Sequence, residues 1–130
     1  MIRGGMAAVA LLACGAAQAC GGPADRVVEG PSYSIAYRAT PSPIPMGQHF
    51  ALDVTVCPRD KSPLPRSLRV DAGMPEHKHG MNYKPTVTAK GGGRFRVEGM
   101  LFHMSGRWEI AFDVASDGAV RRITDAVMVE

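Results

Sequence analysis

Alternation of apolar and polar residues is the main pattern along this chain. Tyr33, Ile35 and Tyr37, for example, take every second position, and Ser34, Ala36 and Arg38 take the alternate ones. Because successive side chains of a strand point to opposite faces, such a segment is predicted to be a strand with one buried and one wet face. The same pattern covers 33–38, 50–56, 68–71, 94–98 and 108–114, and shorter runs near 86–89 and 119–129 bring the expected number to about seven strands.

Turn-forming residues separate these segments and leave no long amphipathic helix. The chain contains ten prolines and fifteen glycines, and segments 90–93 and 116–118 have the composition of hairpin connections. Short alternating strands without intervening helices are typical of an antiparallel sandwich of immunoglobulin-like type, so we predict an all-β, single-domain fold. The residues expected to be buried together in its core are Trp108, Phe112, Phe95, Leu52 and Val54.

The first nineteen residues have the features of a cleaved secretory signal peptide. Arg3 gives a positive start, 6–13 is apolar, and 17–19 is an A-x-A cleavage pattern. An alternative stays open, because 11–14 resembles a bacterial lipobox that would make Cys14 a lipid-bearing N-terminus. The first interpretation predicts a periplasmic or secreted protein and the second a lipoprotein, which would contact a membrane only through Cys14. No later segment is apolar enough to span a bilayer.

The remainder of the chain is predicted to be a flexible lead-in, 20–31, followed by one β-sandwich domain, 32–130. Loss of Arg3 with the signal peptide lowers the formal net charge from +3 to +2. The basic residues are scattered, without a stripe or interleaved aromatic residues. This charge pattern argues against a nucleic-acid partner.

Histidine and methionine concentrate in one turn, 74–81, which reads Met-Pro-Glu-His-Lys-His-Gly-Met. Three of the four histidines and four of the six methionines that follow residue 19 lie between 74 and 104. Imidazole and thioether are ligands that suit copper, and thioether favours Cu(I). In an extended chain, residues 77, 79 and 81 would point the same way. The predicted ligands are therefore His77, His79 and Met81, with Met74 and Met104 as further donors.

A wider order of motifs resembles a known family. The turn Met74-Pro-x-His-x-His-Gly-Met81 is followed by Pro85, Gly93-x-Phe-x-Val97, Gly99, and Phe102-x-Met104-x-Gly106-x-Trp108-Glu109. Across about residues 33–128 the chain resembles the YtkA-like domain family of small exported bacterial β-sandwich proteins, which are related to FixH-like modules. The resemblance implies an immunoglobulin-like sandwich outside the inner membrane, with an association to copper handling and cytochrome oxidase assembly.

Three functional interpretations follow from these residues. In the first, the turn binds copper for delivery or sequestration, with a copper-accepting or membrane protein as partner. In the second, the turn is structural, since methionine fills irregular gaps well, and the protein is an interaction module that uses a sandwich edge. In the third, a zinc ion on His77, His79 and His103 activates water. The methionines would be unexplained in a zinc site, so we expect no enzymatic activity.

Cleavage after Ala19 leaves Cys20 and Cys57 in an oxidising compartment, where an even number of cysteines favours a disulfide. The alternation of 50–56 places Cys57 on the outward face with Asp53 and Thr55. We predict one Cys20–Cys57 disulfide in the exported protein, although two unrelated thiols are the alternative. Mass spectrometry of the exported protein tests this prediction. A lipid adduct on Cys14, or two alkylatable thiols, would contradict it.

Overall fold

The computed structural model describes residues 24–130, so the expected signal peptide, Cys14 and Cys20 lie outside the described residues. Within this range the chain forms strands and no α-helix, and no helix long and apolar enough to cross a membrane is found there. The strands are β1 (Arg26–Glu29), β2 (Tyr33–Thr40), β3 (His49–Pro58), β4 (Ser67–Met74), β5 (His79–Gly80), β6 (Thr86–Gly91), β7 (Arg94–Leu101), β8 (Gly106–Ser116) and β9 (Ala119–Val129).

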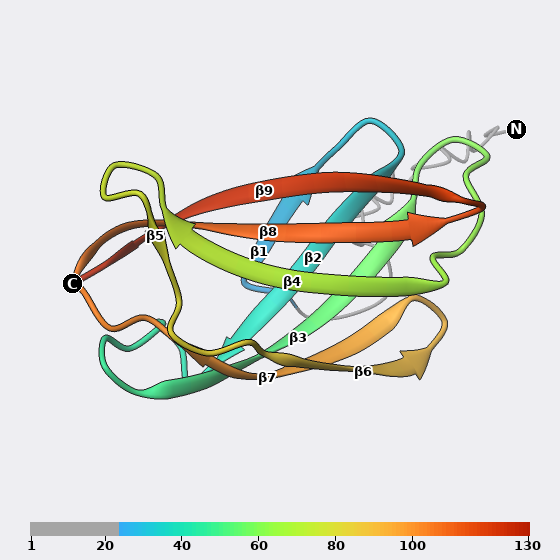
Figure 1. Ribbon diagram of the computed structural model, residues 1–130. Helices are drawn as coiled ribbons and strands as arrows, with labels where there is room; N and C mark the ends of the chain where they lie inside the picture. Colours follow the sequence, from blue (N-terminus) through green and yellow to red (C-terminus); the bar gives the residue numbers. More distant parts are fainter. Residues whose placement is uncertain (1–23) are drawn as a thin grey trace, which may run out of the picture.

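The strands form two antiparallel sheets that pack face to face (Figure 1). One sheet has five strands in the order β1-β2-β3-β7-β6, and the other has four in the order β5-β4-β8-β9. All seven predicted strand segments are present, so the predicted all-β sandwich is confirmed at the level of its two layers. The expectation of about seven strands is low by two, because β1 and the two-residue β5 also form.

Strand β1 lies inside the segment expected to be a flexible lead-in. Val28 stands opposite Ile35 of β2, and Arg26 stands opposite Tyr37. The Arg26 side chain also reaches the second sheet, where its Nε donates a 2.6 Å hydrogen bond to Asp125 of β9. These contacts between distant segments hold the strand in place, and the local sequence gave no indication of them.

The β8–β9 hairpin shows how local sequence determines register. Asp117 and Gly118 form the two-residue connection between paired Ser116 and Ala119. Both central residues have positive φ, 46° and 76°, as a type I′ turn requires, and Asp-Gly is a favoured sequence for that turn. This confirms the predicted hairpin. It also places Trp108, Ile110, Phe112 and Val114 on the inward face of β8.

The core lies between the two sheets and confirms the predicted buried set. Trp108, Phe112 and Leu52 are fully buried, and Val54 and Phe95 are 2% and 5% exposed. Met100 is buried as well, as its position beside Phe102 in an alternating segment predicts. Inward positions of both sheets supply these side chains, so apolar burial holds the two layers together.

Cys57 differs from its expected exposure. It has outward parity on β3, yet its side chain is only 6% exposed. The structure has Cys57 in a disulfide. Since Cys20 lies outside the described residues, the Cys20–Cys57 pairing stays a prediction.

A cluster of polar side chains closes one open side of the sandwich, between β1 and β9. Arg26 donates to both carboxylate oxygens of Asp125, at 2.6 and 2.8 Å, and to the Ala126 carbonyl at 3.2 Å. The buried Tyr37 donates its hydroxyl to the same carboxylate at 2.6 Å. Burial raises the pKa of Asp125, but hydrogen bonds from Arg26 and Tyr37, with the arginine charge, outweigh it and leave the pKa below its usual value.

The change Asp125→Asn should lower the free energy of unfolding by about 2 kcal/mol at neutral pH, because it removes charge-assisted hydrogen bonds to a buried phenol and an arginine. Since the pKa of Asp125 is lower in the folded than in the unfolded state, this stabilisation is complete above about pH 5 and is lost as pH falls through the folded-state pKa.

Urea unfolding of both proteins between pH 7 and pH 2 measures this effect, and the difference between them should shrink on acidification. Asp53→Asn is the control, because Asp53 pairs with Arg96 at 2.9 Å but is 60% exposed. Its loss should cost less than about 1 kcal/mol. A difference for Asp125→Asn that does not change with pH would contradict this account.

Candidate functional site

The His-Met segment forms the tight hairpin between β4 and β5. Residues 75–78 form the turn, the His77 amide donates to the Met74 carbonyl at 3.1 Å, and Lys78 has a φ of 53°. The extended conformation from which we predicted a shared direction for residues 77, 79 and 81 is therefore absent, because the chain reverses there and only His79 enters a strand. The antiparallel pairing of β4 with β5 places His79 directly opposite Met74 instead.

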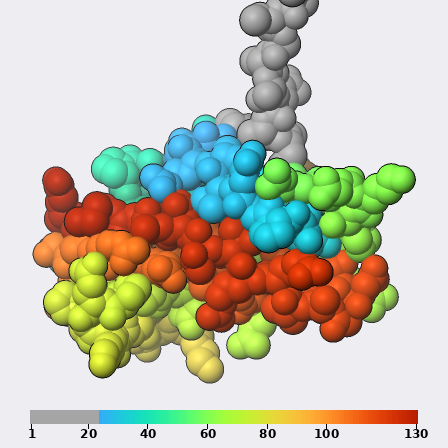
Figure 2. All heavy atoms as spheres, turned by 90° about the horizontal axis from the view of Figure 1, so that it is seen from above, coloured from blue at the N-terminus to red at the C-terminus, as the bar shows by residue number. Residues whose placement is uncertain are grey.

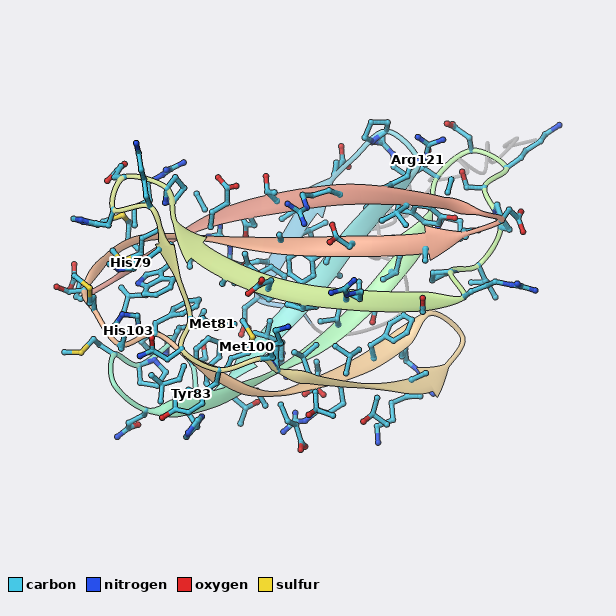
Figure 3. All side chains as sticks on the ribbon, in the orientation of Figure 1. His79, Met81, Tyr83, Met100, His103 and Arg121 are labelled. Carbon is cyan, nitrogen blue, oxygen red and sulfur yellow. The ribbon has the colours of Figure 1, made fainter. Side chains whose placement is uncertain are left out.

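Three histidine rings nonetheless lie in a row at this end of the molecule. The ring centroids of His77 and His79 are 5.8 Å apart, with 20° between the ring planes. Those of His79 and His103 are 5.5 Å apart, with 33° between the planes. Figure 3 shows His79 and His103 at the end of the sandwich where the C-terminus lies, and Figure 2 shows the hairpin projecting there beside the start of β8. The hairpin and the β7–β8 connection, which supplies His103, thus meet at one site.

Buried aromatic side chains of the core pack against His103, the innermost histidine of this row. The Trp108 ring stacks on Phe102 with centroids 4.4 Å apart and planes at 8°, and its centroid lies 5.5 Å from that of the His103 ring with 77° between the planes. Trp108 Nε1 also donates a 2.9 Å hydrogen bond to the Met104 carbonyl. Phe50 in turn contacts Phe102 in a T-shaped arrangement at 4.9 Å. Because these rings are buried and bonded, they fix the position of the His103 loop.

The row runs from solvent to the core. His77 and His79 are exposed, whereas His103 is half-buried. The Nδ1 atom of His103 is buried, and no described residue offers it a hydrogen-bond partner. An unsatisfied buried polar atom costs roughly 1–3 kcal/mol, so a rotation of the ring that brings this nitrogen to a partner atom or an ion would be favourable.

The predicted methionine donors are in different environments. Met81 and Met104 are half-buried and pack against the core cluster. Met74 is only 1% exposed and belongs to the core itself, although it stands directly opposite His79 and therefore on the same face of the sheet. The half-buried pair is thus the more accessible source of thioether near the histidines.

His103 was predicted to be a ligand only in the zinc interpretation, and no role was predicted for Met46. Met46 is 48% exposed and lies beside Phe102 through a bridge between the two chain segments. His49 is exposed, as a position next to a loop suggests, and its ring lies 5.6 Å from Tyr83. It is at the same end but outside the row. The pairing of β3 with β7 places His49 opposite Leu101, and the bridge places Met46 beside Phe102, so both lie close in space to the chain segment that carries His103. Local patterns do not encode these pairings.

A surface ion pair ties the hairpin to β8. Arg107 Nη1 lies 3.7 Å from Glu76 in the turn, and its Nη2 lies 4.0 Å from Glu109. These side chains are partly exposed, so each pair stabilises the fold little. These contacts hold the Glu76 carboxylate next to the histidine hairpin, with the positive charge of Arg107 beside it.

Within residues 24–130, no three His, Cys, Asp or Glu side chains are arranged as a ready-made metal centre. Comparison with protein-family models, with curated proteins and with solved structures returned no match.

Trp108→Phe should lower the free energy of unfolding by about 2–3 kcal/mol, because it leaves space in the core and removes the donor to the Met104 carbonyl. The matched control is Met100→Leu, which nearly conserves volume at another fully buried position and should cost less than about 1.5 kcal/mol. Chemical unfolding measures both. Equal effects of the two changes would contradict the special role of Trp108.

Proposed function

We propose that this protein is an exported bacterial copper protein that binds Cu(I) at the histidine end of its sandwich, for delivery to an acceptor or for sequestration. The observation that carries the proposal is the row of His77, His79 and His103, with the unpartnered Nδ1 of His103 at its buried end. The same proposal covers the periplasmic or secreted location, the immunoglobulin-like topology and membership of the YtkA-like family.

The ring separations support two imidazoles on one ion. Metal–nitrogen bonds of about 2.0 Å place each ring centroid about 3 Å from the metal, so two coordinated rings lie roughly 5–6 Å apart. His79 is 5.8 Å from His77 and 5.5 Å from His103. His79 is therefore the central ligand of the proposed site and pairs with either neighbour after the two rings rotate to direct a nitrogen of each toward the ion.

Thioether donors favour Cu(I) over zinc. Met81 and Met104 pack against the core near the row, with part of each side chain still accessible. Soft thioether sulfur selects Cu(I), and borderline imidazole also suits copper. Met74 is a further donor in this proposal, since it faces the same side of the sheet as His79. Loaded with copper, the site supplies reversible coordination of a soft cation.

The solvent exposure of the proposed site supports transfer of copper to an acceptor as the function of the site. His77 and His79 are open to solvent, while His103 is half-buried. An acceptor with its own soft ligands would reach the exposed histidines first and exchange ligands stepwise. A site closed on all sides would favour permanent retention instead.

The double change His77→Ala and His79→Ala should weaken Cu(I) binding by at least about tenfold, or about 1.4 kcal/mol, while leaving the fold intact, because both side chains are exposed. Anaerobic competition against a Cu(I) chelator measures the affinity, and metal analysis after exposure to Cu(I), Cu(II) and Zn(II) measures selectivity. Cu(I) should be retained in preference to Zn(II).

His49→Ala is the matched control, because it removes an exposed histidine at the same end but outside the row. It should leave Cu(I) affinity within about twofold. Unchanged copper retention in the double variant would leave the turn with a structural role only. The non-metal interaction module would then be the better proposal.

A further inference from the structure

The two open sides of the sandwich differ in how their edge strands are covered. On the side of β1 and β9, Arg26 reaches across, pairs with Asp125 and occupies the Ala126 carbonyl of the β9 edge. On the other side, the free edges of β4 and β6 face each other (Figure 1). Proteins usually block such edges, because unpaired backbone groups are templates for another strand.

Most of the β4 edge is unpaired. Its partner β5 covers only Gly73 and Met74. The Ala72 carbonyl accepts from the Met81 amide at 3.2 Å, which shows that even-numbered residues of β4 direct their backbone groups to this edge. The backbone groups of Leu68 and Val70 therefore point the same way, and no described residue hydrogen-bonds to them on that side.

A groove of about 420 Å³ runs along this unpaired edge. Its β4 wall includes Leu68 and Val70, and its other wall includes Pro85 and Val87 from the crossover and from β6. The groove thus combines free backbone groups with apolar walls. Strand addition uses this combination, since backbone bonds provide affinity and pockets accept alternate side chains.

The charges of the groove favour an acidic occupant. Arg69 on β4 and Lys84 on the crossover are exposed at its rim. Asp113 is already paired with Arg122 at 2.8 and 2.9 Å, and an Asp71 oxygen accepts from the Ala72 amide at 2.8 Å. Three basic and two acidic side chains line the groove, so its formal net charge is +1, which favours the carboxylates of a bound strand over basic side chains.

We propose that the edge of β4 binds an extended, acidic segment of a partner protein by strand addition. Alternate apolar side chains of that segment enter the groove between β4 and β6, and carboxylates between them meet Arg69 and Lys84. This surface is separate from the histidine row. The proposal therefore stands or falls independently of copper binding.

The test uses two soluble peptides of ten residues that alternate Val with Glu or Val with Lys. We expect the Glu peptide to bind at least about tenfold more tightly than the Lys peptide, and to protect the Leu68 and Val70 amides from hydrogen exchange in nuclear magnetic resonance spectra. Arg69→Glu combined with Lys84→Glu should invert the preference. Lys61→Glu combined with Arg121→Glu, the control with the same charge change at exposed positions outside the groove, should leave it unchanged.

Copper loading should not alter peptide binding. Absence of protection at Leu68 and Val70 with either peptide would overturn the proposal, and so would equal effects of the two charge reversals. A concentration-dependent dimer that protects the same amides without peptide would also overturn it, because the edge would then belong to a second copy of the chain.

Discussion

The packing of Trp108 is the interaction on which the rest of the structure depends. Its ring stacks on Phe102 with centroids 4.4 Å apart, its centroid lies 5.5 Å from that of His103, and its Nε1 donates a hydrogen bond to the Met104 carbonyl. One side chain thus joins the two sheets and fixes the loop that brings His103 to the β4–β5 hairpin. Because Trp108 and Phe102 are fully buried, the proposed site has a well-packed aromatic base beneath its exposed turn.

The fold was largely predictable because period-two alternation is clear in strands such as β4 and β8. The buried face of β8 follows directly from Trp108, Ile110, Phe112 and Val114. The elements that were missed depend on distant contacts: β1 is held by Arg26 and Asp125, and the two-residue β5 exists only through its pairing with β4. The histidine cluster was visible in the sequence, but its geometry was not. A turn at Lys78 and the placement of His103 by the β7–β8 connection created the row, where an extended chain had been expected.

The sandwich separates its possible functions in space. One end carries the row of histidine rings and the half-buried thioethers. On one side, hydrogen bonds to Asp125 join the two sheets. On the opposite side, most of the β4 edge is unpaired. The proposed cation site at an end and the proposed strand-binding edge on a side use different residues, so both can be occupied together. This arrangement suits a protein that holds a metal while it is attached to a partner.

The most direct test of the central claim is X-ray absorption spectroscopy at the copper edge on the protein loaded with one equivalent of Cu(I). The account predicts low coordination, with imidazole nitrogen from His79 and a neighbouring histidine and at least one sulfur at thioether distance. A spectrum with only nitrogen and oxygen ligands, or one identical in the His77→Ala and His79→Ala double variant, would contradict it.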